Sequence, residues 1–206
     1  MKKPNIFLDF DGLKFHTASQ LAIYMNGRFG INSKTSDYVN NQPLHIVLRK
    51  YISNNAPSFE EVYIDHIENY QTSIKWHEDM LPMEDMCETM YKLAKKYLLW
   101  TVTSREKTSV KTIRYLLDKH IPGCITGIHC VYEHRGSGVF NEVSKRDFIQ
   151  SVSGEKIAFF DDSPSEILKT QDIIPSYLFD PDGLHDDIGQ ITNRVKNWKE
   201  IGDRFL

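Results

Sequence analysis

The chain has 206 residues and a mass of 24.0 kDa, the size of one domain with room for an insertion. Hydrophobic residues make up 40% and charged residues 26%, values that exclude intrinsic disorder. The formal net charge is -3, so the basic excess typical of a duplex nucleic-acid binder is missing and gives no support for such a partner. A local basic groove remains compatible with this charge.

Apolar runs are short along the whole chain. The longest, such as residues 97–100, fall far below the roughly 20 residues that cross a bilayer, so we expect no membrane span. Lys2 and Lys3 precede an apolar stretch that Asp9 and Asp11 interrupt, unlike a secretory signal, and we expect a cytoplasmic protein. The three cysteines cannot all pair with one another and are expected to be reduced.

The first predicted element is a buried strand at residues 6–8. This apolar run is too short for a helix and ends in Asp9, Asp11 and Gly12. Carboxylates are therefore expected at the C-terminal end of the strand.

A helical insertion is predicted over residues 14–80, between two parts of an α/β core formed by residues 1–13 and 81–206. Its apolar residues have helical spacing at Leu21, Tyr24, Met25 and Phe29, and again at Val62, Ile64, Ile67 and Tyr70. Breaks are expected at Gly30, Asn54, Asn55 and Pro57.

Helices and strands alternate in the rest of the chain. Strands are predicted at 97–102, 125–131, 156–160 and 177–179, and helices at 86–96, 108–119, 145–151 and from about 165. A polar loop is expected at 134–138, and a closing amphipathic helix at 188–205 with Ile191, Val195 and Trp198 on its apolar side. This order predicts an α/β fold with a doubly wound, mostly parallel sheet.

Polar side chains follow three of these strands. The pairs are Asp9 with Asp11, Thr103 with Ser104, and Asp161 with Asp162. One such pair alone is typical of the start of a solvated loop, but ligands of doubly wound sheets bind at the carboxyl ends of the strands. The three pairs together therefore predict a single site.

The residue types in this site suit phosphoryl chemistry. One carboxylate of the first pair can act as nucleophile while the other moves protons, and Gly12 turns the backbone away without blocking a pocket. Asp161 and Asp162 are ligands of the kind Mg²⁺ prefers. Thr103 and Lys145 can hold phosphoryl oxygens.

An apolar strand ending Asp-x-Asp-Gly, a later strand ending in Thr, a Lys, and a strand ending Asp-Asp resemble, in that order, the motifs of the haloacid dehalogenase superfamily. The resemblance covers about residues 6–166. It implies that Asp9 forms an aspartyl-phosphate and Asp11 is the general acid and base. It implies phosphate binding by Thr103 and Lys145, and Mg²⁺ binding by Asp9, the main-chain oxygen of Asp11, and Asp161. Gly12, Ser104 and Arg105 are further candidates for phosphate binding, and Asp162 is a further candidate for the metal.

The resemblance favours a phosphatase over a carbon–halogen hydrolase, because Asp11 stands two residues after the nucleophile. The family inserts a helical cap between its first two motifs, which suits residues 14–80 and would set substrate choice. The Thr-Ser-Arg sequence that follows a modest cap resembles the corresponding motif of 5'(3')-deoxyribonucleotidases. The expected substrate is a small phosphorylated metabolite, and a nucleotide monophosphate is the first candidate. A phosphotransferase or mutase, and a non-catalytic binding module of this fold, are the alternatives.

Some assignments stay open at this stage. Lys156 competes with Lys145, although Lys145 begins a helix whereas Lys156 begins a strand and should point from its far end. Asp162 either binds metal or orients the lysine. Arg105 either contacts phosphate or caps the next helix. Leu13 stands where the family usually has Thr or Val.

Three patterns are interpreted as structural. The second Asp-x-Asp-Gly, at 180–183, is expected to be a turn, because Pro and Gly beside Asp are strong turn formers. Cys124, His129, Cys130 and His134 lack the spacing of a zinc site. The aromatic residues of the insertion are expected mainly to pack, with one or two reaching the pocket.

Overall fold

The computed structural model describes residues 2–38, 47, 49–51, 58–135, 139–185 and 188–206. Within these residues, seven strands form one sheet in the order β4-β3-β2-β1-β5-β6-β7. The strands are β1 (Asn5–Leu8), β2 (Leu98–Glu106), β3 (Ile125–Arg135), β4 (Val139–Glu142), β5 (Lys156–Asp161), β6 (Ser176–Phe179) and β7 (Arg194–Val195). All neighbours are parallel except β3 and β4. The predicted mostly parallel sheet is confirmed.

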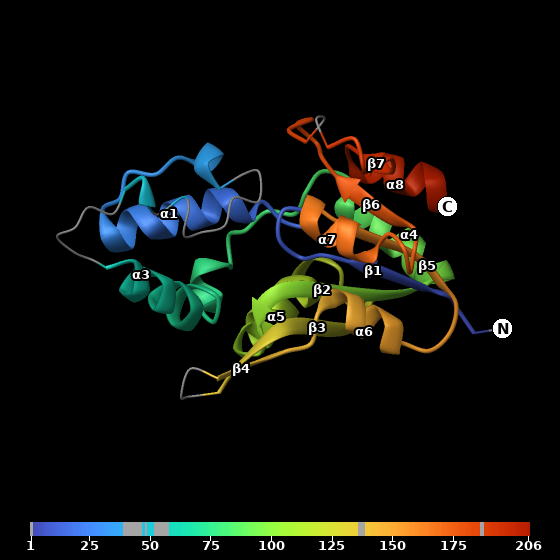
Figure 1. Ribbon diagram of the computed structural model, residues 1–206, viewed down its shortest axis with the longest axis horizontal. Coiled ribbons are helices and arrows are strands. Elements are labelled where there is room, and N and C mark those ends of the chain that lie inside the picture. Colours follow the sequence, from blue (N-terminus) through green and yellow to red (C-terminus); the bar gives the residue numbers. More distant parts are fainter. Residues whose placement is uncertain (1, 39–46, 48, 52–57, 136–138, 186–187) are drawn as a thin grey trace.

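Helices cover both faces of this sheet (Figure 1). One face carries α4 (Met86–Lys96), α5 (Val110–His120) and α8 (Trp198–Phe205), and the other carries α6 (Lys145–Ser151) and α7 (Pro164–Thr170). Ile6 and Leu8 of β1 pack into the first core and Phe7 packs into the second, each fully buried. β1 is an unbroken apolar run because both of its faces are covered.

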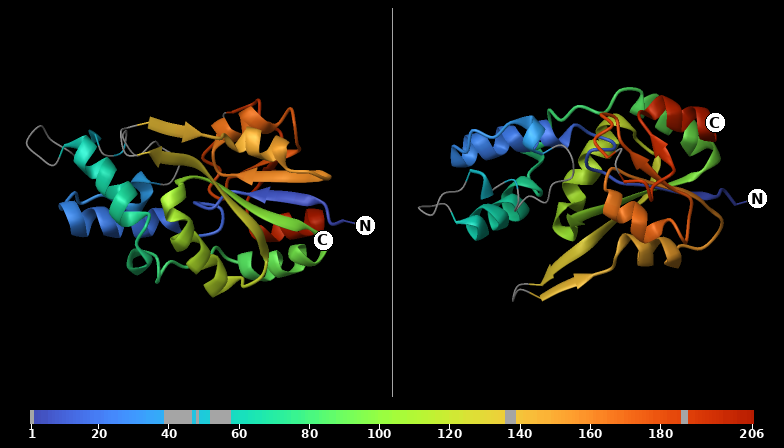
Figure 2. Two further views of the ribbon diagram at one scale, coloured as in Figure 1. Left: turned by 90° about the horizontal axis from the view of Figure 1, so that it is seen from below. Right: turned by 45° about the horizontal axis from the view of Figure 1, so that its top comes forward.

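The described elements between β1 and α4 are all helical. They are α1 (Thr17–Phe29), the short helices η1 (Thr35–Asp37), η2 (His66–Tyr70) and η3 (Ile74–Trp76), and α3 (Phe59–Asp65). They lie beyond the carboxyl ends of the strands, at the end of the molecule opposite the N-terminus (Figures 1 and 2). Gly30 ends α1 with φ +64°, and Asn54, Asn55 and Pro57 lie outside the described residues. That residues 14–80 form a separate cap stays a prediction.

Aromatic side chains make most of the core of this insertion. Tyr24, Met25, Ile31, Val62 and Tyr70 are buried together, with Phe29, Tyr38 and Trp76 packed against them. The expectation that these aromatic residues mainly pack is confirmed. No helix in the described part of the chain is both long and apolar enough to cross a membrane.

The prediction of one closing helix over 188–205 is wrong. Only Trp198–Phe205 is helical, and β7 pairs with β6 before it. Ile191, Val195 and Trp198 are nevertheless all buried. Their spacing therefore correctly indicated buried positions, although most of the segment is not helical. Asn197 caps the helix, because its side chain accepts a hydrogen bond from Glu200 N at 2.9 Å.

Two residues of the polar loop predicted at 134–138, His134 and Arg135, belong instead to the end of a strand. β3 continues to Arg135 and β4 returns antiparallel to it, and Figure 2 shows both strands projecting from the sheet edge. Residues 136–138 lie outside the described residues. A short helix η4 (Lys107–Ser109) separates β2 from α5. β2 itself continues to Glu106, so Thr103 and Arg105 belong to the strand.

Candidate active site

A buried cluster of charges lies where β1, β5 and α6 meet. Lys145 Nζ donates to Asp9 Oδ1 at 2.6 Å and to Asp161 Oδ2 at 2.7 Å. These three side chains are between 1% and 5% exposed. Ser144 caps α6 by accepting a hydrogen bond from Asp147 N at 3.0 Å, which holds Lys145 in the first helical turn. Strand ends and a helix start thus bring together residues that are 136 positions apart in sequence.

The competing lysine lies elsewhere. Lys156 begins β5 and is paired in register with Asn5, at the amino end of both strands. The structure therefore brings Lys145, and not Lys156, to the carboxylates.

Three carboxylates at this point suit a divalent cation. Oxygens of Asp9, Asp161 and Asp162 lie within 4.8 Å of one another, and no other group of three potential metal ligands occurs among the described residues. Burial raises the pKa of Asp161 to about 7, although the Lys145 charge opposes this, and burial also raises the pKa of Asp9. With all three carboxylates ionised, the cluster would carry more negative charge than one ammonium offsets, and a bound cation would favour these ionised forms. Hard oxygen ligands with this excess charge fit Mg²⁺.

We expect the metal-free protein to lose stability as the pH rises from about 4 to about 7. In this range Asp161 keeps its proton in the folded state, where its pKa is about 7, but has released it in the unfolded state. The folded state then binds more protons than the unfolded state. The free energy of unfolding therefore falls as the pH rises, until Asp161 has also ionised in the folded state. Urea unfolding in a chelator across this range measures the effect, and Asp161→Asn should flatten it. A midpoint that rises with pH only in wild type would contradict the assignment.

Gly12 lies directly beneath Asp162. A Cβ built at Gly12 would be 1.9 Å from Asp162 Oδ2, and the backbone has φ +66°. A side chain at this position would have to displace the Asp162 carboxylate and would strain the backbone. The glycine of Asp-x-Asp-Gly therefore leaves the space that the Asp162 side chain occupies.

Gly12→Ala is expected to displace Asp162 and lower kcat/KM by at least about 100-fold, an effect of the size that small misplacements in active sites produce. Gly30→Ala is the matched control, since Gly30 has φ +64° and open space around its Cα. Both variants should lose about 1–2 kcal/mol of stability from the left-handed backbone. Equal activity losses in the two variants would show that strain, not Asp162, matters.

Asp11 is held by Arg105. The guanidinium donates from Nε to Asp11 Oδ2 at 2.9 Å and from Nη2 to Oδ1 at 2.8 Å. Burial alone would raise the pKa of Asp11, but the Arg105 charge holds it below its ordinary value. Arg105 thus contacts the second carboxylate of the motif and does not simply cap the next helix.

Thr103 and Ser104 point to opposite sides of β2. Thr103 is 1% exposed and its hydroxyl accepts a hydrogen bond from Arg105 N at 3.3 Å, whereas Ser104 is exposed. Ser104 does not line the pocket described below. Thr103 is therefore buried beside Arg105 within β2, and phosphate binding by its hydroxyl stays a prediction. The exposed Ser104 side chain lies on the other side of the strand.

Lys14 is a site residue that the sequence reasoning missed. Its side chain is fully buried, and Nζ donates to the main-chain oxygen of Leu8 at 3.0 Å and to that of Asp9. Burial lowers the pKa of Lys14 to about 7. A lysine between Leu13 and Phe15, in an apolar run directly after the motif, was the available signal. Trp198 Nε1 donates to Leu13 O at 2.8 Å and holds this same segment.

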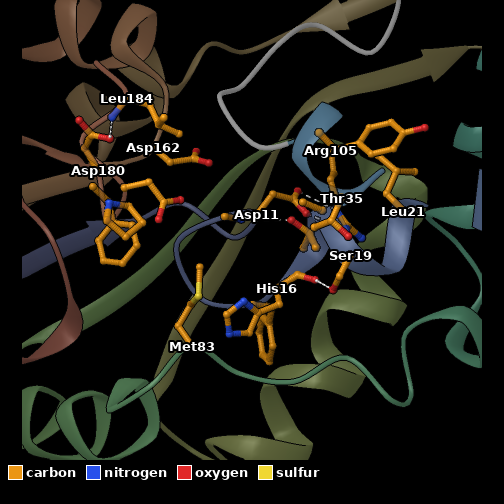
Figure 3. A pocket seen from close by; sticks show the side chains of 18 of the residues that line it. Asp11, His16, Ser19, Leu21, Thr35, Met83, Arg105, Asp162, Asp180 and Leu184 are labelled. Atoms are coloured by element: carbon orange, nitrogen blue, oxygen red, sulfur yellow. Dashed lines mark hydrogen bonds and ion pairs between the residues drawn. The ribbon is translucent and has the colours of Figure 1, made fainter. Parts of the chain in front are cut away.

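A pocket of about 420 Å³ opens beside these residues. Figure 3 shows Asp11 between two groups of side chains: Ser19, Leu21, Thr35 and Arg105 on one side, and Asp162, Asp180 and Leu184 on the other. The pocket thus lies between the core and the insertion. Three aromatic residues of the insertion, Phe15, Tyr38 and Tyr70, line it, one more than expected, as does the exposed His16.

The second Asp-x-Asp-Gly is a turn, as predicted. Asp180 accepts hydrogen bonds from Leu184 N at 2.9 Å and His185 N at 3.2 Å, and pairs with Arg194. The turn also lines the pocket, a placement that its sequence did not indicate. Cys124 and Cys130 are free thiols.

No protein-family model matches the sequence, and no curated protein matches it. Solved structures do resemble the fold. A haloacid dehalogenase-like hydrolase from Streptococcus pneumoniae aligns with a TM-score of 0.71 and 16% identity over 99% of both chains. A putative phosphatase from Clostridium difficile gives 0.67 and 20% over 100% of both chains. A magnesium-bound putative hydrolase of the same family from Bacillus subtilis gives 0.62 and 15% over 100% of this chain and 99% of that one. The chain therefore has the fold of the haloacid dehalogenase-like hydrolases.

Proposed function

We propose that the protein is a Mg²⁺-dependent phosphatase that hydrolyses a small phosphomonoester through an aspartyl-phosphate on Asp9. The observation that carries this proposal is the bridge from Lys145 to Asp9 and Asp161 beside Asp162, at the edge of a pocket that Asp11 lines. The phosphatase and hydrolase folds among the structural neighbours support it.

In the first step Asp9 attacks the phosphorus, the bond to the leaving oxygen breaks, and Asp11 gives that oxygen a proton. Lys145 orients Asp9 for this attack and attracts the phosphoryl oxygens, as does the Thr103 hydroxyl. In the second step a water attacks the phosphorus, returns a proton to Asp11, and releases phosphate from Asp9. Arg105 opposes protonation of Asp11, because it donates to both Asp11 oxygens and lowers the pKa of this carboxyl, so release from Arg105 would make Asp11 a better proton carrier.

Mg²⁺ would be held by Asp9, Asp161 and Asp162, together with the main-chain oxygen of Asp11 that the family resemblance implies. When bound, it supplies positive charge to the transferring phosphoryl oxygens.

Phosphate release from a panel of nucleotide, sugar and small organic-acid monophosphates, with Mg²⁺ or with a chelator, tests this function. We expect release that requires Mg²⁺ from at least one class. Nucleotide monophosphates belong in the panel as the class that the sequence ranked first. Added alcohols detect phosphoryl transfer, the enzymatic alternative. No turnover of any compound at high enzyme concentration would favour a non-catalytic binding module.

A further inference from the structure

Arg105 presents a preorganised carboxylate-binding fork to the pocket. Arg105 is only 4% exposed, yet it lines the cavity and holds the Asp11 carboxylate through two hydrogen bonds of 2.9 and 2.8 Å. This planar pairing matches the shape of a guanidinium to that of a carboxylate. The structure thus shows directly which chemical group Arg105 accepts.

The guanidinium is fixed from its other sides. Nη1 lies 3.0 Å from His77 Nε2, and His77 Nδ1 lies 2.9 Å from Ser73 O. Because Nδ1 donates to that main-chain oxygen, Nε2 accepts from Arg105. The Arg105 Cζ also lies 4.9 Å from the centroid of the Phe10 ring. Arg105 therefore keeps its position when its partner on the pocket side changes.

Arg105 is the only lysine or arginine among the described residues that line the pocket. Four carboxylates line the same cavity: Asp11, Asp162, Asp180 and Asp182. These aspartates repel an anionic group on a bound molecule, whereas Arg105 attracts it. Arg105 lies on the side of Asp11 where Ser19, Leu21 and Thr35 of the insertion also lie (Figure 3). A substrate with its phosphorus at Asp9 would extend its leaving group into this pocket, because Asp11, two residues further along the chain, lines it.

We propose that the substrate carries a carboxylate on its leaving group and that this carboxylate replaces Asp11 on Arg105. The exchange would free both oxygens of Asp11 at the moment a substrate is bound. A carboxylate is favoured over a second phosphate because the fork already holds a planar monoanion, and the described residues that line the pocket include no second lysine or arginine to offset a dianion. This inference rests on the proposed phosphatase function, and it replaces the nucleotide monophosphate as the first substrate class.

Matched substrates test the exchange. The probes are the monophosphates of glycolic acid and of 3-hydroxypropanoic acid, each beside its primary amide, which has the same shape without the charge. We expect kcat/KM for the better acid to exceed that of its amide by about 10- to 100-fold, the range of a charge-assisted hydrogen-bonded pair. Arg105→Gln should reduce this ratio to below about threefold, mainly through KM, and Arg105→Lys should give an intermediate ratio, since it keeps charge but loses the fork. Lys111→Gln, which removes an exposed cation from α5, should keep the wild-type ratio.

Wild-type protein gives a second measurement that does not depend on the variants folding. Glycolate should inhibit hydrolysis about tenfold more strongly than glycolamide, if the carboxylate of the released alcohol binds Arg105. Equal rates for acid and amide, a ratio that survives Arg105→Gln, or faster hydrolysis of ethylene glycol bisphosphate than of either acid would overturn the inference and leave the phosphatase function standing. Failure of acids and amides alike to release phosphate, in a panel where nothing else does, would instead reject the function itself.

Discussion

Asp9→Asn is expected to lower kcat for phosphate release by at least about 10⁴-fold, as removal of a covalent nucleophile does in other enzymes. The amide keeps the size and the geometry of the carboxylate but lacks the anionic oxygen that attacks phosphorus. It also removes the negative charge of one of the two carboxylates that Lys145 contacts. Phosphate release under saturating substrate and Mg²⁺ measures the effect.

Asp180→Asn is the matched control for this variant, because Asp180 begins the second Asp-x-Asp-Gly of the chain. The Asn oxygen can still accept from Leu184 N, whereas His185 N and Arg194 lose the oxygen that they share, so circular dichroism first checks that the variant folds. We expect this variant to retain at least about a tenth of the wild-type rate, as for most substitutions that leave reacting groups in place. If Asp180→Asn were inactive and Asp9→Asn active, the nucleophile would be assigned to the wrong strand.

Lys145→Met is expected to reduce both stability and activity. Without the ammonium, Asp9 and Asp161 face each other as buried carboxylates, and removing one partner of such a buried network costs about 3–5 kcal/mol. The loss of a cation beside the transferring group should also lower kcat by roughly 10²–10³-fold. Urea unfolding in a chelator and steady-state kinetics in Mg²⁺ measure the two effects separately.

Lys156→Met serves as the control for the lysine. Lys156 is only partly buried at the start of β5, away from the carboxylates, so its loss should change stability by less than about 0.5 kcal/mol and leave the rate unaltered. A large rate loss in Lys156→Met, with Lys145→Met close to wild type, would show that the phosphate-binding lysine was assigned wrongly.

Local sequence patterns predicted the parts of the fold that depend on local packing. The apolar run of β1 is buried on both faces, and the helical spacing over 86–96 and 145–151 corresponds to α4 and α6. Since parallel strands end at one edge of a sheet, the same patterns predicted that the carboxylates after β1 and β5 would meet. Lys145 followed from its place at a helix start.

Pairings between distant segments were beyond these patterns. β4 and β7 are short edge strands whose partners are chosen by the sheet and not by their own sequences. His77 is one of four histidines in residues 14–80, and nothing local indicates that its Nε2 supports Arg105. From the sequence alone Lys14 would be taken for a surface residue, whereas in the structure its ammonium donates to the main-chain oxygens of Leu8 and Asp9.

The central claim is that phosphate passes through a covalent bond to Asp9. Acid quenching during turnover of the best substrate, followed by borohydride reduction and peptide mass spectrometry, tests it directly, because reduction converts an aspartyl-phosphate to homoserine. The account predicts homoserine at position 9, dependent on substrate and Mg²⁺ and absent from Asp9→Asn. Phosphate release with no modified residue, or with modification at a residue other than Asp9, would contradict it.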